Sequence, residues 1–490
     1  MTAQISNLSD LVNSNARFFQ ASIDDDGNGP FIYRHHHLEK GITKWINIYR
    51  SLNLQKTNPS IGLLHELNFE YICMLYAAIG IGANFVVLES KFDDSSSHKD
   101  FMPLDILVYD DTLDNMCDDM SYWNNNSQHR IDSRLLPKIK SSDENTNTND
   151  ISSIDLNFDW SKTQMLSSAT SGSTGVSKKI THNYQYILDI SQRNAEVLNF
   201  NGRVVHIKNL YHGSTMPVFY LPALLKSDFH FCAPWIDSSN LEEIEKYIKN
   251  QLSWTEYLDI NHILFPYTFM MDNFLNSVVK FNMSFTDLTV YTLSYIKPQY
   301  KNLIKGRNIK IVSIFGCTET SGPVMINSLT DSNAEEFDPT IFYTLDDYFT
   351  LTLLPDGTRV QTKNGWIDHV MDDKFKKIDH NCYQHLGKSN QYRINDVKID
   401  LAKISNISKL IGFDGDIIVD EPQQSLYLVL WNNDDLQHLQ DVVNQQLNLM
   451  FGSELVHISK AANLNKLEFI SGIKINQDMI RKYFRNTEEH

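Results

Sequence analysis

The residues best suited to chemistry lie just under halfway along the chain. The segment Thr170-Ser171-Gly172-Ser173-Thr174-Gly175-Val176-Ser177-Lys178-Lys179 combines hydroxyl side chains, glycines and lysines. Glycine lets the backbone turn its N–H groups toward an anion, and hydroxyl and ammonium groups add further donors. The segment therefore predicts a phosphate-binding loop.

Two other interpretations of this segment are a Walker-type phosphate loop and a surface linker. A Walker-type loop needs Gly immediately before its Lys and Ser or Thr after it, whereas here Ser177 precedes Lys178 and Lys179 follows. This order argues against a kinase or P-loop ATPase. A surface linker rich in Ser and Gly is the alternative for the stretch taken alone.

A second candidate segment is Phe315-Gly316-Cys317-Thr318-Glu319-Thr320. It follows Ile311-Val312-Ser313-Ile314, an apolar run that predicts a short buried strand ending at a glycine turn. In isolation Thr318 and Glu319 suit the cap of a following helix.

The two segments resemble the signature sequences of the adenylate-forming superfamily, which includes acyl- and aryl-CoA synthetases, peptide-synthetase adenylation domains and firefly luciferases. The resemblance implies that residues 170–175 and Lys178 hold phosphate groups. It also implies that Phe315, beside Gly316 in the nucleotide site, packs against the adenine. By the same resemblance Thr318 bonds the α-phosphate and Glu319 holds Mg²⁺.

Other segments match the same superfamily from about residue 60 onward. Asp373 precedes Gly387-Lys388 at the spacing that separates the ribose-binding aspartate from the family's Gly-Arg pair. Lys474 lies in a segment similar to the Gly-Lys-Ile loop whose lysine reaches the adenylation site. The remaining matches are Glu66 to Tyr71 and Ala77 to Ala83, an early helix and turn, and Tyr392 to Leu401, which opens the small mobile domain.

Several positions depart from the family pattern. They are Ser177 for proline, Lys388 for arginine, Asn390 for aspartate, Met371-Asp372 for Thr-Gly, and Ile473 for glycine. Lys388 keeps the charge without the guanidinium fork. These departures leave a catalytically silent nucleotide-binding regulatory homologue as an alternative, whereas the survival of Glu319 and Lys474 favours an enzyme.

One position bears on the substrate. In Tyr211-His212-Gly213-Ser214, His212 stands where amino-acid adenylation domains place an aspartate for the substrate's ammonium group. This predicts an acyl or aryl acid, with a buried core histidine as the alternative role for His212 and an amino-acid-activating enzyme as the alternative function. The apolar segments around Phe219 and Phe265 are candidate pocket walls.

The pattern of apolar runs predicts an α/β fold. The runs Asn84 to Leu88 and Asp105 to Tyr109 alternate with helical patterns such as Leu241 to Gln251, and residues 140–155 form a polar low-complexity loop. After Asn390 a hairpin (Asp416 to Val419 and Leu426 to Trp431) precedes an amphipathic helix, Asp434 to Met450. We expect a large domain of α/β subdomains carrying the adenylation site at 1–389 and a small mobile α+β lid at 390–490.

Composition excludes several classes. The 490 residues carry 43 basic and 60 acidic side chains, a net charge of −17, without a basic run interleaved with aromatics, so nucleic-acid binding is disfavoured. The cysteines form no C-x-x-C pair, which suits a reducing cytosol. Neither a signal-peptide pattern nor a long apolar run occurs, so we expect a cytoplasmic protein without a membrane span. His35-His36-His37 is interpreted as a polar surface turn, with metal ligation as the alternative.

Together these features predict an acid-activating ligase that uses ATP and Mg²⁺. It forms an acyl-adenylate and pyrophosphate, with Lys178, Thr318, Glu319 and Lys474 neutralising charge and His212 near the acid. The acyl group is then expected to pass to CoA, a phosphopantetheine carrier protein or an amine. The sequence leaves the acid and the acceptor open.

Overall fold

The structure is a computed structural model, and statements about it concern the residues that it describes. These are residues 15–20, 31–52, 54, 58–64, 69–87, 103–109, 127–133, 136, 165–170, 178–206, 216–232, 259–265, 268–293, 296–388, 391–394, 397–420, 425–431, 435–451, 456–471 and 474–486. The chain forms two compact units. Unit 1 comprises Met1–Tyr291 with Ser321–Pro323, and unit 2 comprises Thr292–Thr320 with Val324–His490.

One sheet of unit 1 is mainly parallel and belongs to the α/β fold that the apolar runs predict. Its strand order is β6-β5-β3-β4-β7-β8, with bounds β3 (Ser60–Leu64), β4 (Asn84–Val87), β5 (Leu104–Tyr109), β6 (Ser127–Asp132), β7 (Met165–Thr170) and β8 (Lys178–Asn183). Only β8 runs antiparallel to its neighbour, β7. Helix α2 (Phe69–Gly80), buried along almost its whole length, connects β3 to β4. The expected strands at residues 84–88 and 105–109 are confirmed as β4 and β5.

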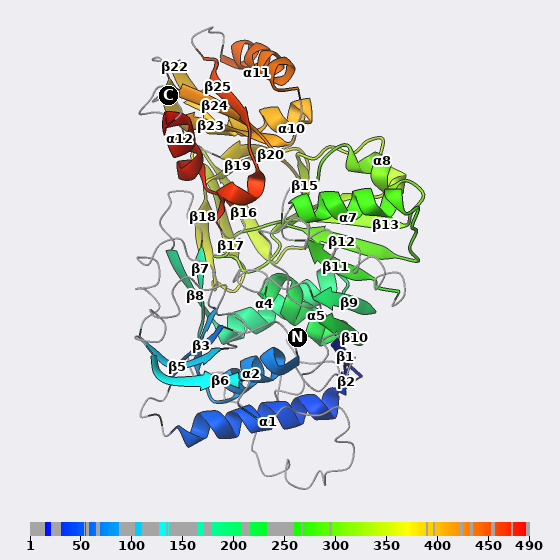
Figure 1. Ribbon diagram of the computed structural model, residues 1–490, viewed down its shortest axis with the longest axis vertical. Helices are drawn as coiled ribbons and strands as arrows, with labels where there is room; N and C mark the ends of the chain where they lie inside the picture. The colour runs from blue at the N-terminus through cyan, green and yellow to red at the C-terminus, as the bar shows by residue number, and fades with distance from the viewer. Residues whose placement is uncertain are drawn as a thin grey trace. The chain divides into compact units, whose positions relative to one another are not determined.

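The other sheet of unit 1 has the strand order β12-β11-β9-β10-β1-β2. Its strands are β1 (Arg17–Gln20), β2 (Phe31–Arg34), β9 (Arg203–His206), β10 (Phe229–Cys232), β11 (His262–Phe265) and β12 (Leu288–Thr292). Strand β9 lies between two parallel neighbours, β10 and β11. Among the described residues, the helices of unit 1 besides α2 are α1 (His35–Ser51), α4 (Tyr184–Val197), the short π-helical turn η6 (Met216–Tyr220), α5 (Leu221–Lys226) and α7 (Thr268–Lys280) (Figure 1).

The three consecutive histidines form no surface turn, which corrects the sequence interpretation. They are the first three residues of α1. The His37 ring is buried and its Nδ1 accepts a hydrogen bond of 3.0 Å from the backbone N–H of Arg34, which helps to cap the helix. A capping role therefore explains one of these histidines without a metal.

Unit 2 begins with an antiparallel sheet of order β19-β20-β15-β14-β13. Its strands are β13 (Ile309–Phe315), β14 (Met325–Leu329), β15 (Ile341–Thr344), β19 (Asp373–Lys377) and β20 (Cys382–Lys388). A separate sheet of order β16-β17-β18 contains β16 (Phe349–Leu354), β17 (Gly357–Thr362) and β18 (Asp368–Met371). Helix α8 (Tyr300–Ile304) and the 3-10 turn η7 (Asp331–Asn333) complete this part.

The last part of unit 2 packs helices on both faces of a small sheet of order β23-β24-β25 (Figure 1). Along β24, Leu426, Leu428 and Leu430 join one apolar cluster, which includes α11, whereas Tyr427 and Val429 join the other, which includes α12. This period of two is the pattern of a strand buried on both faces. The elements are β21 (Gln391–Ile394), β22 (Val397–Asp400), α9 (Leu401–Ser405), α10 (Ile407–Ile411), β23 (Gly415–Asp420), β24 (Ser425–Leu430), α11 (Leu436–Phe451), β25 (Ile458–Asn463), η9 (Lys466–Phe469), β26 (Ile470–Ser471), β27 (Lys474–Ile475) and α12 (Gln477–Asn486).

Most of the local expectations for this region are confirmed. The hairpin is β23–β24 and the amphipathic helix is α11. Residues 140–155 and the helical pattern from Leu241 to Gln251 lie outside the described residues. The boundary between residues 389 and 390 stays a prediction. Among the described residues, none of the helices is long and apolar enough to cross a membrane.

We predict that two leucines of α11 differ sharply in their contribution to stability. Leu447 is 0% exposed in the cluster under β24, whereas Leu449 is 73% exposed. Leu447→Ala should lower the free energy of unfolding by about 2–5 kcal/mol, because it opens a cavity. The matched control Leu449→Ala should change it by less than about 0.5 kcal/mol. Denaturant unfolding measures both, and equal effects would contradict the packing described here.

Candidate functional site

The ends of the predicted phosphate loop meet across two strands. Thr170, the last residue of β7, pairs in backbone register with Lys178, the first residue of β8. Strand β7 is the last of the parallel strands, so the segment follows a carboxyl end of the parallel sheet, where α/β folds place their ligands. Residues 171–177, and the side chains of Thr170 and Lys178, lie outside the described residues.

The second segment forms a tight turn at the end of β13. The Thr320 N–H donates to the Cys317 carbonyl at 3.1 Å. The Thr320 hydroxyl accepts from the Cys317 N–H at 3.1 Å and donates to the Cys317 carbonyl at 2.9 Å. The next regular element is β14, so the alternative that Thr318 and Glu319 cap a following helix is wrong.

The turn holds three chemically different side chains. Thr318 is buried, with 6% of its surface exposed, and the Glu319 side chain is 26% exposed. Burial, with the charge of Glu319 as a second cause, raises the pKa of the Cys317 thiol to about 12. Among these side chains the Glu319 carboxylate is the one presented partly to solvent as an anion.

Asp373, the predicted ribose ligand, lies opposite Lys388 in the register of β19 and β20. Its carboxylate oxygen Oδ1 is 2.9 Å from Nε2 of His385, another residue of β20. The His385 ring lies 5.5 Å, centroid to centroid, from the ring of Phe315. The structure therefore brings together the residues predicted to bind the ribose and the adenine, with His385 touching both.

A lysine completes this chain of contacts. Nζ of Lys409, in α10, is 3.4 Å from Nδ1 of His385. Because an ammonium group only donates, Nδ1 accepts and Nε2 carries the ring hydrogen that is donated to Asp373. Burial lowers the pKa of Lys409, and the negative charge of Asp373 opposes that shift. Sequence reasoning missed His385 and Lys409, because neither stands in a recognisable motif.

The residues after the turn are held by the helix that follows the phosphate segment. A Cβ atom on Gly322 would lie 2.7 Å from Cγ1 of Ile190 in α4, so only glycine fits without movement. The buried Arg193 side chain, also from α4, donates to the carbonyl of Pro323 at 2.6 Å. Helix α4 starts directly after β8 and thus packs, within unit 1, against the chain just beyond the second signature.

The remaining candidates are described only in part. Ser471 and Lys474 pair across β26 and β27, and the expected helix after them is α12. The Lys474 side chain and His212 lie outside the described residues. Among the candidate pocket walls, Phe219 is buried and packs edge-on against Phe200, so it belongs to an aromatic core. The sequence offers no signal for His369, which lies close to Glu319.

We predict that substitutions at Gly322 and Ile190 have coupled effects on the free energy of unfolding, because the two residues lie so close together. Gly322→Ala should cost about 1–3 kcal/mol in the free energy of unfolding, because its Cβ overlaps the isoleucine side chain. The cost should shrink in an Ile190→Ala background, where that side chain is gone. The measurement is a double-mutant cycle by denaturant unfolding. An equal cost in both backgrounds would contradict the contact.

Comparison with known proteins shows the fold. No protein-family model matches the chain, and no curated protein matches its sequence. An anthranilate CoA ligase in complex with anthranoyl-AMP is similar in structure (TM-score 0.69, 12% identity), covering 100% of this chain and 99% of the ligase. O-succinylbenzoate coenzyme A synthetase from Bacillus subtilis is similar in its AMP complex (TM-score 0.71, 12% identity, 97% and 98% of the chains) and in its complex with ATP and a magnesium ion (TM-score 0.67, 12% identity, 95% and 96%). Since these likenesses span almost the whole chain, the protein shares the fold of these CoA ligase and synthetase structures.

Proposed function

We propose that this protein activates an acyl or aryl carboxylic acid with ATP, forming an acyl-adenylate and releasing pyrophosphate. The observation that carries the proposal is the position of His385. Its ring contacts both the Phe315 ring and the Asp373 carboxylate. Two residues distant in sequence, proposed to bind the adenine and the ribose of one nucleotide, thus lie beside each other.

The structural neighbours support the same chemistry. One was solved with anthranoyl-AMP, an aryl-adenylate, and another with AMP and with ATP and magnesium. The likeness in sequence is low, at 12% identity, so the proposal depends on the side chains of this protein. An aryl or acyl acid is favoured over an amino acid because His212 offers no carboxylate to an ammonium group.

The proposed reaction requires the protein to offset the negative charge of the phosphates and of the attacking carboxylate. The acid's carboxylate attacks the α-phosphorus in line, the bond to the β,γ-pyrophosphate breaks, and the acyl-AMP anhydride forms. Lys178 would bind the phosphates, the Thr318 hydroxyl would donate to an α-phosphate oxygen, and Lys474 would lie between the carboxylate and the phosphate. Such positioned donors stabilise the transition state because they need no reorganisation during the reaction.

The turn offers one carboxylate that suits a nucleotide-bound Mg²⁺ ion. Mg²⁺ bound with a nucleotide takes one or two protein carboxylates and fills its other positions with phosphate oxygens and water. Glu319 supplies such a carboxylate, partly exposed in the turn. When bound, the ion would neutralise phosphate charge. The proposed cofactors are therefore ATP as substrate and Mg²⁺ held by Glu319.

We further propose that residues 390–490 move as a lid before the acyl group passes to a thiol of CoA or a carrier protein, or to an amine. Two contacts join this region to earlier segments of unit 2. Lys409 contacts His385, and Nζ of Lys297 lies 3.0 Å from Oδ2 of Asp414 in a largely buried ion pair. A rotation near Asn390 would break both contacts, so they favour the conformation described here.

We predict acid-dependent release of pyrophosphate from Mg·ATP by the full-length protein. Fatty and aromatic acids should drive it, and free α-amino acids should not. Glu319→Gln should abolish the activity, because it removes the anionic oxygen ligand of Mg²⁺. The measurement is an assay in which added pyrophosphatase converts the released pyrophosphate to phosphate, repeated for each acid of a panel.

The control for Glu319→Gln is Glu336→Gln, an exposed carboxylate in the same unit, which should leave pyrophosphate release unchanged. Circular dichroism and thermal unfolding show whether each variant is folded. Release confined to α-amino acids would contradict the substrate class. Absence of release with every acid would favour a silent nucleotide-binding protein.

We predict that Lys474 acts in the first half-reaction alone. Lys474→Ala should slow ATP-driven activation about 100- to 1,000-fold, equivalent to roughly 3–4 kcal/mol of lost charge stabilisation. Transfer from synthetic acyl-AMP to the acceptor should keep its rate. Single-turnover assays of both steps measure the difference. Equal losses in both steps, or none in either, would remove Lys474 from this role.

A further inference from the structure

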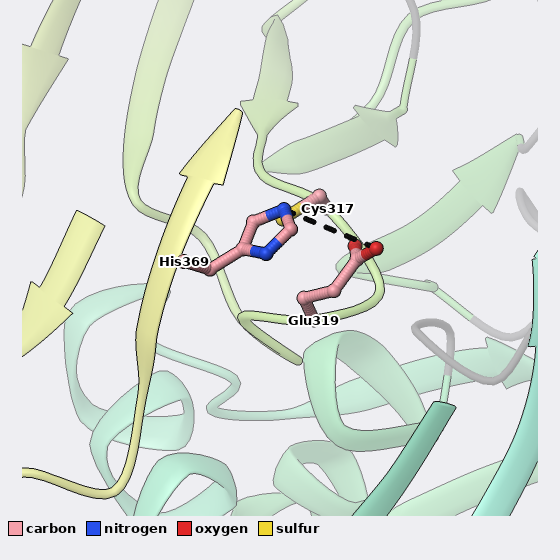
Figure 2. A group of neighbouring side chains, drawn as sticks. All are labelled: Cys317, Glu319 and His369. Carbon is pink, nitrogen blue, oxygen red and sulfur yellow. Dashed lines mark ion pairs between the residues drawn. The ribbon is translucent and has the colours of Figure 1, made fainter. Parts of the chain in front are cut away.

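Two side chains of the turn that carries Glu319 lie close to a histidine, and the three together could bind a metal ion. Cys317, Glu319 and His369 each offer one donor atom, and these three atoms lie within 4.8 Å of one another. Nε2 of His369 is 3.9 Å from Oε1 of Glu319. Figure 2 shows that the same ring nitrogen also faces the Cys317 sulphur, so the three donors converge on one point. Among the described residues, no other group of three such side chains converges in this way.

The spacing suits a small tetrahedral ion. Two ligands bound to tetrahedral Zn²⁺ lie about 3.4–3.6 Å apart, given bond lengths of about 2.0–2.3 Å. The donor atoms lie at most 4.8 Å apart, and the Glu319–His369 pair lies 3.9 Å apart, so modest side-chain movements would reach that spacing. The arrangement is therefore close to a three-ligand site as it stands.

The donor types select the class of ion. Mg²⁺ and Ca²⁺ prefer oxygen ligands alone, whereas one sulphur, one imidazole nitrogen and one carboxylate oxygen suit Zn²⁺ and related transition metals. Three protein ligands with a fourth position open is the arrangement of reactive rather than purely structural zinc sites. The Glu319 and His369 side chains are 26% and 34% exposed, so an ion can enter from solvent.

The backbone holds the donors in place. Cys317 is fixed by its three hydrogen bonds with Thr320. His369 belongs to β18 and pairs with Val360 of β17, a fully buried residue. Next to this pair, the guanidinium of Arg359 in β17 donates two hydrogen bonds to the Asp368 carboxylate in β18, which stabilises the pairing of these strands. Ligands on a fixed turn and a paired strand need little ordering when an ion binds.

Two simpler interpretations fit less well. A bare ion pair between His369 and Glu319 at 3.9 Å is longer than a hydrogen bond and does not involve the Cys317 sulphur, whose own contact is with the Thr320 hydroxyl at 3.8 Å. In a Cys–His nucleophilic pair, a carboxylate would orient the imidazole through its second nitrogen. Here Glu319 and Cys317 face the same nitrogen (Figure 2).

We propose that Cys317, Glu319 and His369 bind a transition-metal ion of the Zn²⁺ class, distinct in its ligands from the Mg²⁺ that accompanies a nucleotide. One consequence rests on the proposed function. Zn²⁺ bound to Glu319 withdraws this carboxylate from the Mg²⁺ of the nucleotide, so Zn²⁺ at this site competes with Mg·ATP and inhibits acid activation. The fourth position of the ion is left to water or another small ligand.

The direct test is binding of Co²⁺ to the full-length, chelator-treated protein. Thiolate ligation gives an intense near-ultraviolet charge-transfer band, and tetrahedral geometry gives strong visible bands. We expect one equivalent of Co²⁺ to produce both, and Zn²⁺ to displace it. Cys317→Ser should remove the charge-transfer band, and His369→Gln should weaken Zn²⁺ binding at least about 100-fold, more than is typical when a residue that only hydrogen-bonds to a metal ligand is changed.

The controls separate this proposal from the proposed function. His380→Gln changes a histidine in an exposed turn and should leave Co²⁺ binding unchanged, and Cys382→Ser tests a second cysteine of the same unit. Thermal unfolding of each variant checks that it is folded. A charge-transfer band that survives Cys317→Ser, or Zn²⁺ affinity unchanged in folded His369→Gln, would overturn the site. Neither measurement depends on whether the protein adenylates an acid.

A separate assay tests whether Zn²⁺ inhibits acid activation. Zn²⁺ should inhibit acid-dependent pyrophosphate release in competition with Mg·ATP. The Zn²⁺ concentration for half inhibition should rise about 100-fold or more in His369→Gln, with each protein normalised to its metal-free rate. Non-competitive inhibition, or equal sensitivity in wild type and variant, would contradict the sharing of Glu319.

Discussion

The hydroxyl of Thr320 fixes the turn on which the rest of the site depends. It bonds both the N–H and the carbonyl of Cys317, so the residues between them have little freedom. The next residue, Ser321, has a φ of 49°, in the left-handed region that costs a non-glycine residue about 1 kcal/mol or more. Gly322 then lies too close to Ile190 for any side chain. The bonds of Thr320 therefore hold the residues between Cys317 and Thr320, Glu319 among them, in a defined position.

The residues of unit 2 that are proposed to bind the nucleotide lie close together because the antiparallel sheet pairs their strands. Phe315 ends β13, Asp373 begins β19 and His385 lies in β20, so strand pairing brings distant parts of the sequence to one edge. The buried rings of Phe342 and Phe375 pack edge-on against Phe315 and support it from the core side. Lys409 adds a contact from α10, so the same small region also touches the segment proposed to move.

The sequence predicted elements whose pattern is local. Strands β4, β5 and β13, the β23–β24 hairpin and helix α11 follow from apolar runs or periodicity alone. The signature segments predicted the fold through their resemblance to a known superfamily, although the chain shares only 12% identity with its structural neighbours. The histidines that open α1 were misjudged, since three identical polar residues carry no periodicity.

What the sequence could not predict are the contacts between lone residues from different strands. His385 and His369 are single histidines without a motif, and each gains its role when strand pairing places it beside Asp373 or Glu319. Cys317 occupies the variable position of its signature, so the sequence alone gives its sulphur no role, and only the position of His369 beside it suggests one. Such sites depend on register, which apolar periodicity specifies only through the fold as a whole.

The central claim is that an acid's carboxylate oxygen attacks the α-phosphorus of ATP. The most direct measurement uses an acid whose carboxylate carries the heavy oxygen isotope, with mass spectrometry of the nucleotide released after transfer to the acceptor. The account predicts one heavy oxygen in AMP and none in pyrophosphate, because the anhydride oxygen stays with the phosphorus when the acyl group leaves. Heavy oxygen in inorganic phosphate with ADP as the nucleotide product would contradict it.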